Sequence, residues 1–105
     1  MRVVGELPSR MIEHFGSAGF RHARVARGDV QVSVADLDGV IGGHDARSPQ
    51  LLVVLSGRVI ASTRDESVEL GVREAVEWQE GEWHETRSLE RSVLLLVEGA
   101  LHELV

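Results

Sequence analysis

At 105 residues, the chain is long enough for one domain that buries roughly two-thirds of its unfolded surface. Hydrophobic residues make up 43% and charged residues 27%, which excludes a disordered or collagen-like chain. The net charge of −6 argues against nucleic-acid binding, which needs Lys and Arg to neutralise phosphates, and the absence of cysteine excludes disulfides and thiolate metal sites.

Residues 1–28 carry most of the basic character. They hold five Arg against two Glu, a net charge of +3, so the other 77 residues carry −9. We expect this segment to be an N-terminal extension that packs on its own barrel or on that of a partner. Residues 1–8 lack the apolar stretch of a signal peptide, and no apolar run is long enough for a membrane span. A cytoplasmic protein without a membrane partner is therefore expected.

Residues 6–16 are predicted to form a short helix. Ser9 is a candidate N-cap, apolar residues follow it at helical spacing, and Gly16 would end the helix. From residue 20 onward the hydrophobic period is two, which is typical of strands. Strands are predicted over 20–27 and 30–35, with turns at residues 28–29 and 38–39.

The rest of the chain predicts more short strands. They cover residues 51–55, 58–63, 68–70, 75–78, 84–87, 93–97 and 101–105. Ser56-Gly57 predicts a two-residue hairpin, and Ser88 to Arg91 predict another turn. Eight or nine short strands of this kind predict an all-β protein, an antiparallel barrel or sandwich that forms a single domain over residues 1–105.

Two of the predicted strands, 51–55 and 93–97, are apolar on both faces. In an antiparallel sheet, continuous hydrophobicity indicates that the second face is also covered. A chain of this length has little material to cover it, so we expect a homodimer.

Two segments place a histidine and polar neighbours beside a predicted strand. They are Gly43 to Gln50, which leads into the strand 51–55, and Gly81 to Ser88. These segments resemble the two motifs of the cupin family, whose members are small antiparallel β-barrels with a central pocket. The resemblance covers residues 30–97, and the chain is similar to small bacterial single-domain cupins. It implies a cupin-like double-stranded β-helix, or jelly roll, with degenerate metal-binding motifs.

The same resemblance implies a metal-ligand set of His44, Gln50 and His84. Gln50 stands where the family has a glutamate, and Ala46 stands where it has a further histidine. Without that carboxylate the set lacks the charge that holds a divalent ion, unless Glu82 or Asp45 compensates. The candidate cofactor is a divalent ion (Zn, Ni, Fe or Mn), and the alternative is that the histidines only form hydrogen bonds at the pocket mouth.

Strand alternation puts every second residue of 50–54 on one face, and likewise every second residue of 82–86. If both faces look into the barrel, their side chains converge in one pocket. The predicted ligand-binding residues are His44, Gln50, Leu52, Val54, Trp78, His84 and Thr86. Glu82, near the rim, is the candidate catalytic base, whereas His14, His22 and His102 are expected at the surface.

Three functions remain open at this point. The protein is a module that binds or senses a small molecule, a metal-dependent oxygenase or isomerase, or an interaction dimer with a vestigial pocket. The fold does not choose among them, because barrels of this kind host many functions. The missing carboxylate weakens the enzyme and the retained histidines weaken the interaction role, so a small-molecule ligand is preferred.

Overall fold

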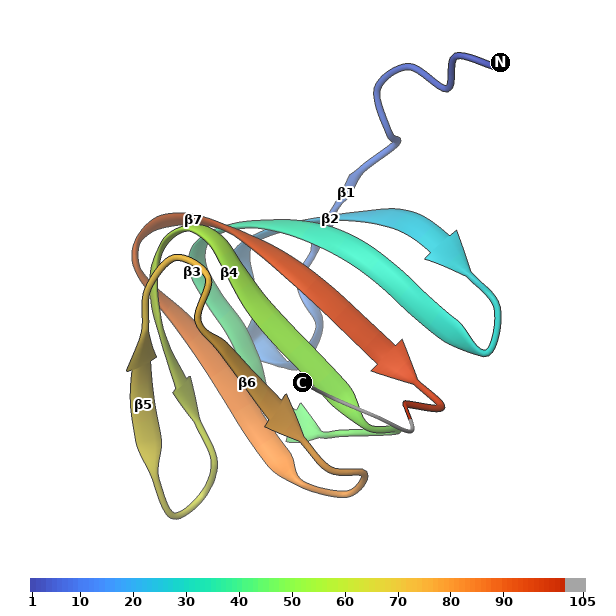
Figure 1. Ribbon diagram of the computed structural model, residues 1–105. Coiled ribbons are helices and arrows are strands. Elements are labelled where there is room, and N and C mark those ends of the chain that lie inside the picture. Colours follow the sequence, from blue (N-terminus) through green and yellow to red (C-terminus); the bar gives the residue numbers. More distant parts are fainter. Residues whose placement is uncertain (102–105) are drawn as a thin grey trace.

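The computed structural model describes residues 1–101, which form an antiparallel β-structure. Its strands are β1 (Arg10–Ile12), β2 (Ala18–Arg27), β3 (Val30–Asp45), β4 (Gln50–Ser62), β5 (Ser67–Leu70), β6 (Ala75–Trp78) and β7 (Trp83–Gly99). The hydrogen-bonded order is β1-β2-β3-β7-β4-β5, and β6 pairs with β4 outside that path. The strands wrap around a common interior, as Figure 1 shows. The predicted all-β barrel is confirmed.

Strands β3, β4 and β7 are long because the chain bends within them instead of turning back. Pairing between β4 and β7 continues from Gln50 to Ser62, with register shifts around residues 54–59. At this bend Gly57 has a φ of 88°, and a Cβ there would clash with Ser92, so only glycine fits. The Ser92 hydroxyl accepts a 3.0 Å hydrogen bond from the Arg58 backbone N–H.

The predicted turns inside these strands are therefore wrong. The residues concerned are Asp38-Gly39, Ser56-Gly57 and Ser88 to Arg91, and all lie within continuous strands. Ser88 accepts a 2.7 Å hydrogen bond from the Gly39 backbone N–H, at the register shift between β3 and β7. A serine hydroxyl thus satisfies a backbone group at each bend, where the ladder itself is interrupted.

The predicted helix over residues 6–16 is also wrong. Arg10–Ile12 pairs with β2, and the structure forms one short 3-10 turn, η1 (His14–Gly16). Phe15 and Gly16 have φ values of 57° and 74°, left-handed conformations that end a helix. Ile12 packs against the buried core from β1, which favours strand pairing over helix formation.

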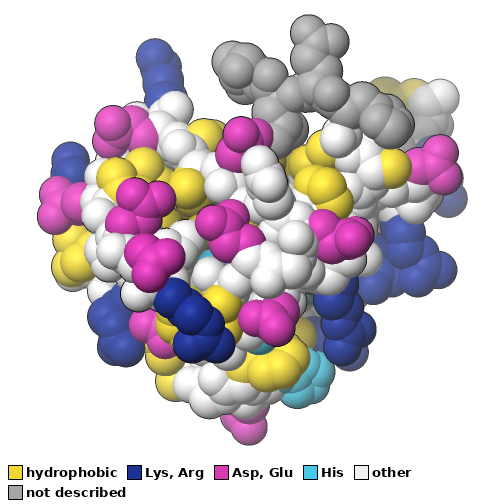
Figure 2. All heavy atoms as spheres, turned by 90° about the horizontal axis from the view of Figure 1, so that it is seen from below, with side chains coloured by type: hydrophobic (Ala, Val, Ile, Leu, Met, Phe, Trp, Pro, Cys, Tyr) yellow, Lys and Arg dark blue, Asp and Glu magenta, His cyan; other side chains and the backbone are white. Residues whose placement is uncertain are grey.

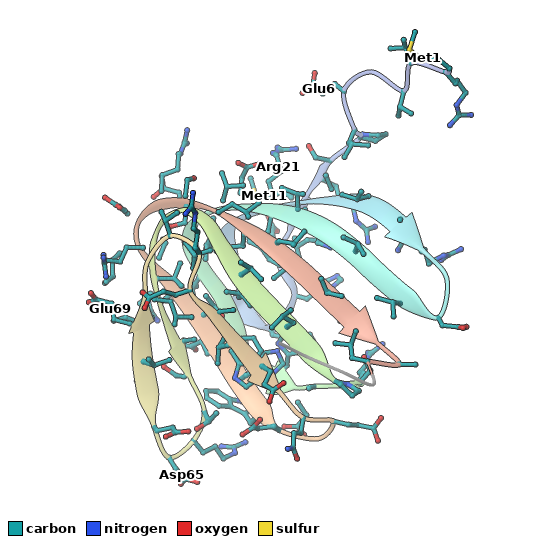
Figure 3. All side chains as sticks on the ribbon, in the orientation of Figure 1. Met1, Glu6, Met11, Arg21, Asp65 and Glu69 are labelled. Carbon is teal, nitrogen blue, oxygen red and sulfur yellow. The ribbon has the colours of Figure 1, made fainter. Side chains whose placement is uncertain are left out.

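The N-terminal extension divides into two parts. Residues 10–12 and 18–27 pair within the sheet of their own chain. The segment that carries Met1 and Glu6 projects away from the barrel. Asp65 and Glu69, in contrast, belong to the barrel, in β5 and in the turn that precedes β5 (Figures 1 and 3). No helix in residues 1–101 is long and apolar enough to span a membrane. His102 and most of the predicted last strand lie outside the described residues.

The hydrophobic core is built from the inward faces of the long strands. Leu37, Leu52, Val54, Val59 and Leu94 have at most 1% of their surface exposed. Trp78 closes the core from β6 and is 3% exposed. Four members of this core, Phe20, Ile41, Leu52 and Trp78, also line a cavity.

Candidate functional site

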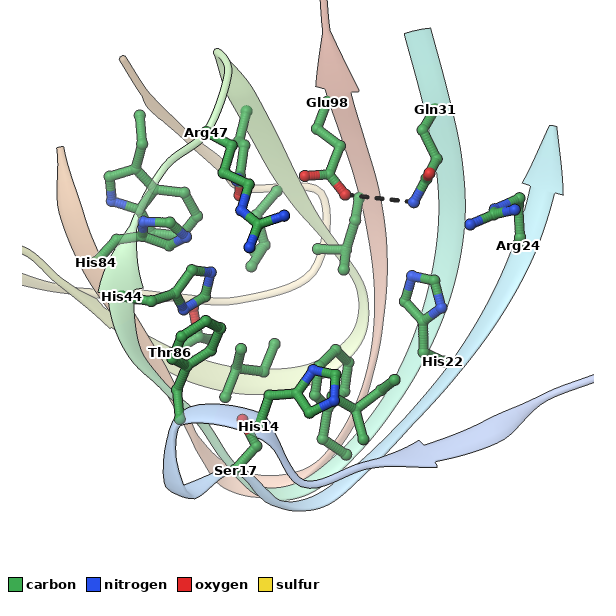
Figure 4. Close-up of a pocket in the computed structure, with 18 of the residues that line it drawn as sticks. His14, Ser17, His22, Arg24, Gln31, His44, Arg47, His84, Thr86 and Glu98 are labelled. Atoms are coloured by element: carbon green, nitrogen blue, oxygen red, sulfur yellow. Dashed lines mark hydrogen bonds between the residues drawn. The ribbon is translucent and has the colours of Figure 1, made fainter. Parts of the chain in front are cut away.

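A cavity of about 410 Å³ opens between the strands and the turn η1. Its size lies in the range of roughly 300–1,000 Å³ typical of small-molecule sites. Apolar side chains that line it are Ile12, Phe15, Phe20, Ile41, Leu52, Trp78 and Leu96. Polar and charged ones are Arg10, His14, Ser17, His22, Arg24, Gln31, His44, Arg47, Gln50, His84, Thr86 and Glu98 (Figure 4).

His44 and His84 lie side by side in this cavity. They are direct cross-strand partners of β3 and β7, and their ring centroids are 4.5 Å apart. Phe15 stacks on His44 at 4.5 Å, and Trp78 stacks on His84 at 4.4 Å. Four rings from η1, β3, β7 and β6 therefore form one row of contacts, in which each imidazole is stacked on an aromatic ring and the two imidazoles are tilted by 56° to each other.

Both histidines also have the same tautomer. Nδ1 of His44 donates to the Gly42 carbonyl oxygen at 2.8 Å, and Nδ1 of His84 donates to the Glu82 carbonyl oxygen at 3.2 Å. A carbonyl oxygen only accepts, so Nδ1 of each ring carries a proton, and in the neutral ring Nε2 carries the lone pair. Each Nε2 is thus an acceptor for a ligand hydroxyl or amide, or a donor to a metal ion.

The environment of His84 keeps its ring neutral. This side chain is 4% exposed, and burial lowers its pKa below the ordinary value of 6.5. The bond to the Glu82 carbonyl raises the pKa, whereas the neighbouring His44 lowers it. His84 is therefore an uncharged hydrogen-bonding group at pH 7.

Six of the predicted pocket residues meet in this cavity, and two predicted site residues do not. The six are His44, Gln50, Leu52, Trp78, His84 and Thr86. Val54 lies in the buried core, one step further along the same face of β4 as Leu52. The Glu82 carboxylate is also absent from the lining, and it accepts a 3.1 Å hydrogen bond from the Gln79 backbone N–H. Glu82 contributes its backbone carbonyl to the site, where it accepts from Nδ1 of His84.

The cavity includes residues that the sequence analysis placed elsewhere. His14 is exposed, as expected, and also lines the cavity, whereas His22, which was expected at the surface, is half-buried in its wall. Arg10 was not predicted as a cavity residue because residues 6–16 were expected to form a helix. Only the pairing of β1 with β2 places Arg10 opposite His22. In β2, the alternation of Phe20, His22 and Arg24 puts all three on one face, and that signal was readable from the sequence.

Trp83 lies on the outside of this site. Its ring covers Gly43, where a Cβ would clash with the indole. The Arg64 guanidinium stands 5.0 Å above the centre of the same ring. Trp83 thus seals the outer face of β3 next to His44, and it does not line the cavity.

We predict that His22 titrates below its ordinary pKa of 6.5. Burial is the largest cause, and the positive charges of Arg10 and Arg24 lower the pKa further. The folded protein then protonates His22 only at a lower pH than the unfolded chain does. The neutral His22 therefore makes its full contribution to the free energy of unfolding above pH 6.5, and this contribution is lost as the pH falls through the folded-state pKa. An NMR titration of the imidazole C–H signals measures this pKa.

The Arg10→Gln variant is the control for the cause of this shift. Removing the charge should raise the pKa of His22 part of the way back, because burial remains. A His22 pKa that is normal in the wild type, or unmoved by Arg10→Gln, would contradict the assigned environment.

Comparison with known proteins identifies similar structures but no similar sequence. No family model matches the chain, and no curated protein does. KdgF from Halomonas sp. superposes with a TM-score of 0.81 at 19% identity, covering 95% of this chain and 94% of that one. An RmlC-like cupin from Shewanella frigidimarina NCIMB 400 gives 0.81 at 12% identity, covering 97% and 91%. A cupin superfamily protein from Desulfitobacterium hafniense DCB-2 gives 0.70 at 18% identity, covering 74% of each.

Proposed function

Because this chain has the cupin fold, we propose that it binds or senses a small molecule held in the cavity of the barrel. The observation that carries this proposal is the composition of the cavity. Polar groups of His44, Gln50, His84 and Thr86 converge above apolar side chains such as Leu52. Ligand sites combine apolar walls with polar groups that fix the orientation of the ligand.

The alternative of a metal-dependent enzyme has weaker support from the donor set. The family resemblance implies a divalent ion held by His44, Gln50 and His84, but these residues supply two neutral rings and an amide. Residues 1–101 hold no group of three or more His, Cys, Asp and Glu side chains arranged to bind a metal. Zinc and iron sites with two histidines usually add a carboxylate or a third histidine, and an amide oxygen is a weaker donor than either, so this set does not fit a tightly held ion. The two Nε2 atoms serve instead as hydrogen-bond acceptors.

A thermal-shift screen of metabolites tests the proposal, with His44→Phe as the matched variant. Phenylalanine keeps a ring in contact with Phe15 and His84, but it removes both nitrogens of His44, the Nε2 acceptor and the Nδ1 donor to Gly42. We expect a compound that raises the melting temperature of the wild type and not that of His44→Phe. A screen without such a compound would contradict the proposal.

Metal analysis of protein purified without a histidine tag separates the two functions. We expect substoichiometric metal. A stoichiometric ion that is lost in both His44→Ala and His84→Ala would instead favour the metal-dependent enzyme. In that case the cavity histidines would act as ligands and not as acceptors.

We also propose that the protein is a homodimer formed by the outer face of the long strands. Because Leu52 and Leu94 point inward, their neighbours point outward. One outward cross-strand row is Val34, Leu95 and Val53, and the next is Val32, Val97 and Leu51. All six are only partly buried in the single chain, so a second copy would cover an apolar face.

Light scattering tests this assembly. The expected mass is twice 11.5 kDa, and Leu95→Glu should reduce it to that of one chain because it places a charge in the apolar face. Leu89→Glu, at a site already 48% exposed, is the control that should remain dimeric. A wild-type protein that is monomeric at micromolar concentration would refute the dimer.

A further inference from the structure

The charged residues of the cavity have the opposite sign to the rest of the protein. The lining holds Arg10, Arg24 and Arg47 against one acidic residue, Glu98, a net charge of +2 with histidines counted as neutral. Since the whole chain carries −6, everything outside the lining carries −8. Arg24 and Arg47 come from opposite sides of the opening (Figure 4). Acidic side chains are widely spread over the molecular surface seen in Figure 2.

Within residues 1–101, no acidic side chain forms an ion pair with these three arginines. The ion pairs within residues 1–101 are Arg58–Glu69, Arg87–Glu85 and Arg91–Asp38, and none includes a cavity arginine. Glu98 is within 3.4 Å of the Gln31 amide, which donates to it. The guanidinium groups at the cavity thus retain their capacity for two-point hydrogen bonding to a carboxylate.

A second observation shows that this charge acts inside the cavity. Arg10 and Arg24 both lower the pKa of His22, whose ring lines the same space. A positive potential that disfavours a protonated imidazole favours a bound anion for the same reason. Burial of His22 is the largest cause of its lowered pKa, and the two positive charges add to it.

The interior of the cavity indicates an organic ligand. Phe20, Ile41, Leu52 and Leu96 line it, and its volume is about 410 Å³. An inorganic anion would leave most of this apolar surface uncovered. A carbon skeleton with a charged group at each end would use both the apolar walls and the arginines at the opening.

We propose that the ligand is a small organic dianion of the dicarboxylate class, bound with its carboxylates near Arg24 and Arg47. This inference rests on the proposed binding function and adds the chemical class of the ligand. Two negative charges balance the net +2 of the lining. The arginine side chains are exposed at the opening, so their attraction is sensitive to salt.

Adipate, its monoamide and its diamide are suitable probes, because they share one length and carry two, one and no negative charges. Calorimetry or tryptophan fluorescence, with Trp78 in the cavity wall, measures their affinity. We expect adipate to bind at least about tenfold more tightly than the diamide, with the monoamide between them. Raising NaCl from about 20 mM to about 200 mM should reduce the difference.

Substitutions of individual arginines show which of them cause the preference for adipate over the diamide. Arg24→Gln and Arg47→Gln should each weaken adipate by about fivefold or more, as expected for loss of a charged hydrogen-bonding partner, and leave the diamide unchanged. Arg91→Gln, whose side chain lies away from the cavity, is the control that should bind adipate normally. Equal affinities across the three probes, equal losses in Arg91→Gln and Arg47→Gln, or no binding at about 10 mM adipate would overturn the dianion.

Different results would contradict the dianion and the binding function. A neutral compound that stabilises the wild type but not His44→Phe, together with no preference for adipate, would keep the binding function and eliminate the dianion. Absence of any compound that depends on His44 would contradict the binding function itself.

Discussion

Replacement of Gly42 by alanine is expected to detach η1 from β3 and to destabilise the protein by about 2–3 kcal/mol. A Cβ at Gly42 would clash with the backbone carbonyl of Phe15. Unlike a side chain, this carbonyl cannot relieve the clash by changing rotamer. The buried bond from the Gly42 N–H to the Ser17 hydroxyl (2.8 Å) would be strained as well. Since η1 carries Phe15 onto His44, the variant should also lose ligand affinity.

Gly28→Ala provides the matched control, because a Cβ at Gly28 has nothing within 4 Å and its φ is not left-handed. Urea denaturation of both variants measures the difference. Equal stability of Gly42→Ala and Gly28→Ala would show that η1 does not pack on β3 as described.

Trp78→Ala should be the most destabilising single change near the site, with an expected loss of about 3–5 kcal/mol. The indole is 3% exposed, belongs to the core cluster and stacks on His84, so its removal leaves a large cavity. A domain of this size has about 5–15 kcal/mol of stability, and this loss is a large part of it. Thermal and urea denaturation measure the change.

Two further variants distinguish the loss of core packing at Trp78 from a loss of stability that any substitution would cause. Trp78→Phe keeps a ring against His84 and should recover part of the loss. Leu89→Ala, at a 48% exposed position, should change stability by about 0.5 kcal/mol or less. If Trp78→Ala and Leu89→Ala behaved alike, the core described here would be incorrect.

The fold class was predictable because alternation of apolar and polar residues reports strand faces locally. The bends within the long strands were not predictable, because a Ser-Gly pair is equally compatible with a hairpin turn and with a β-bulge. At Ser56-Gly57 the outcome depends on Ser92, which lies far along the chain and binds the Arg58 backbone. The predicted helix failed for a similar reason, since the pairing of β1 with β2 outweighs its local helical spacing.

The candidate site divides in the same way. His44 and His84 were placed by their motifs, and the structure makes them cross-strand neighbours. Arg24 shares a face of β2 with Phe20 and His22, which the alternation indicates, but Arg10 and Arg47 carry no such local signal. Their position follows from the β1–β2 register and from the loop before β4.

A crystal structure with the compound that gives the largest thermal shift is the most direct test of the ligand site. The account predicts density for that compound inside the barrel, within hydrogen-bond distance of Nε2 of His44 or His84. Density only on the outer surface, with side chains filling the space beside the two imidazoles, would contradict it.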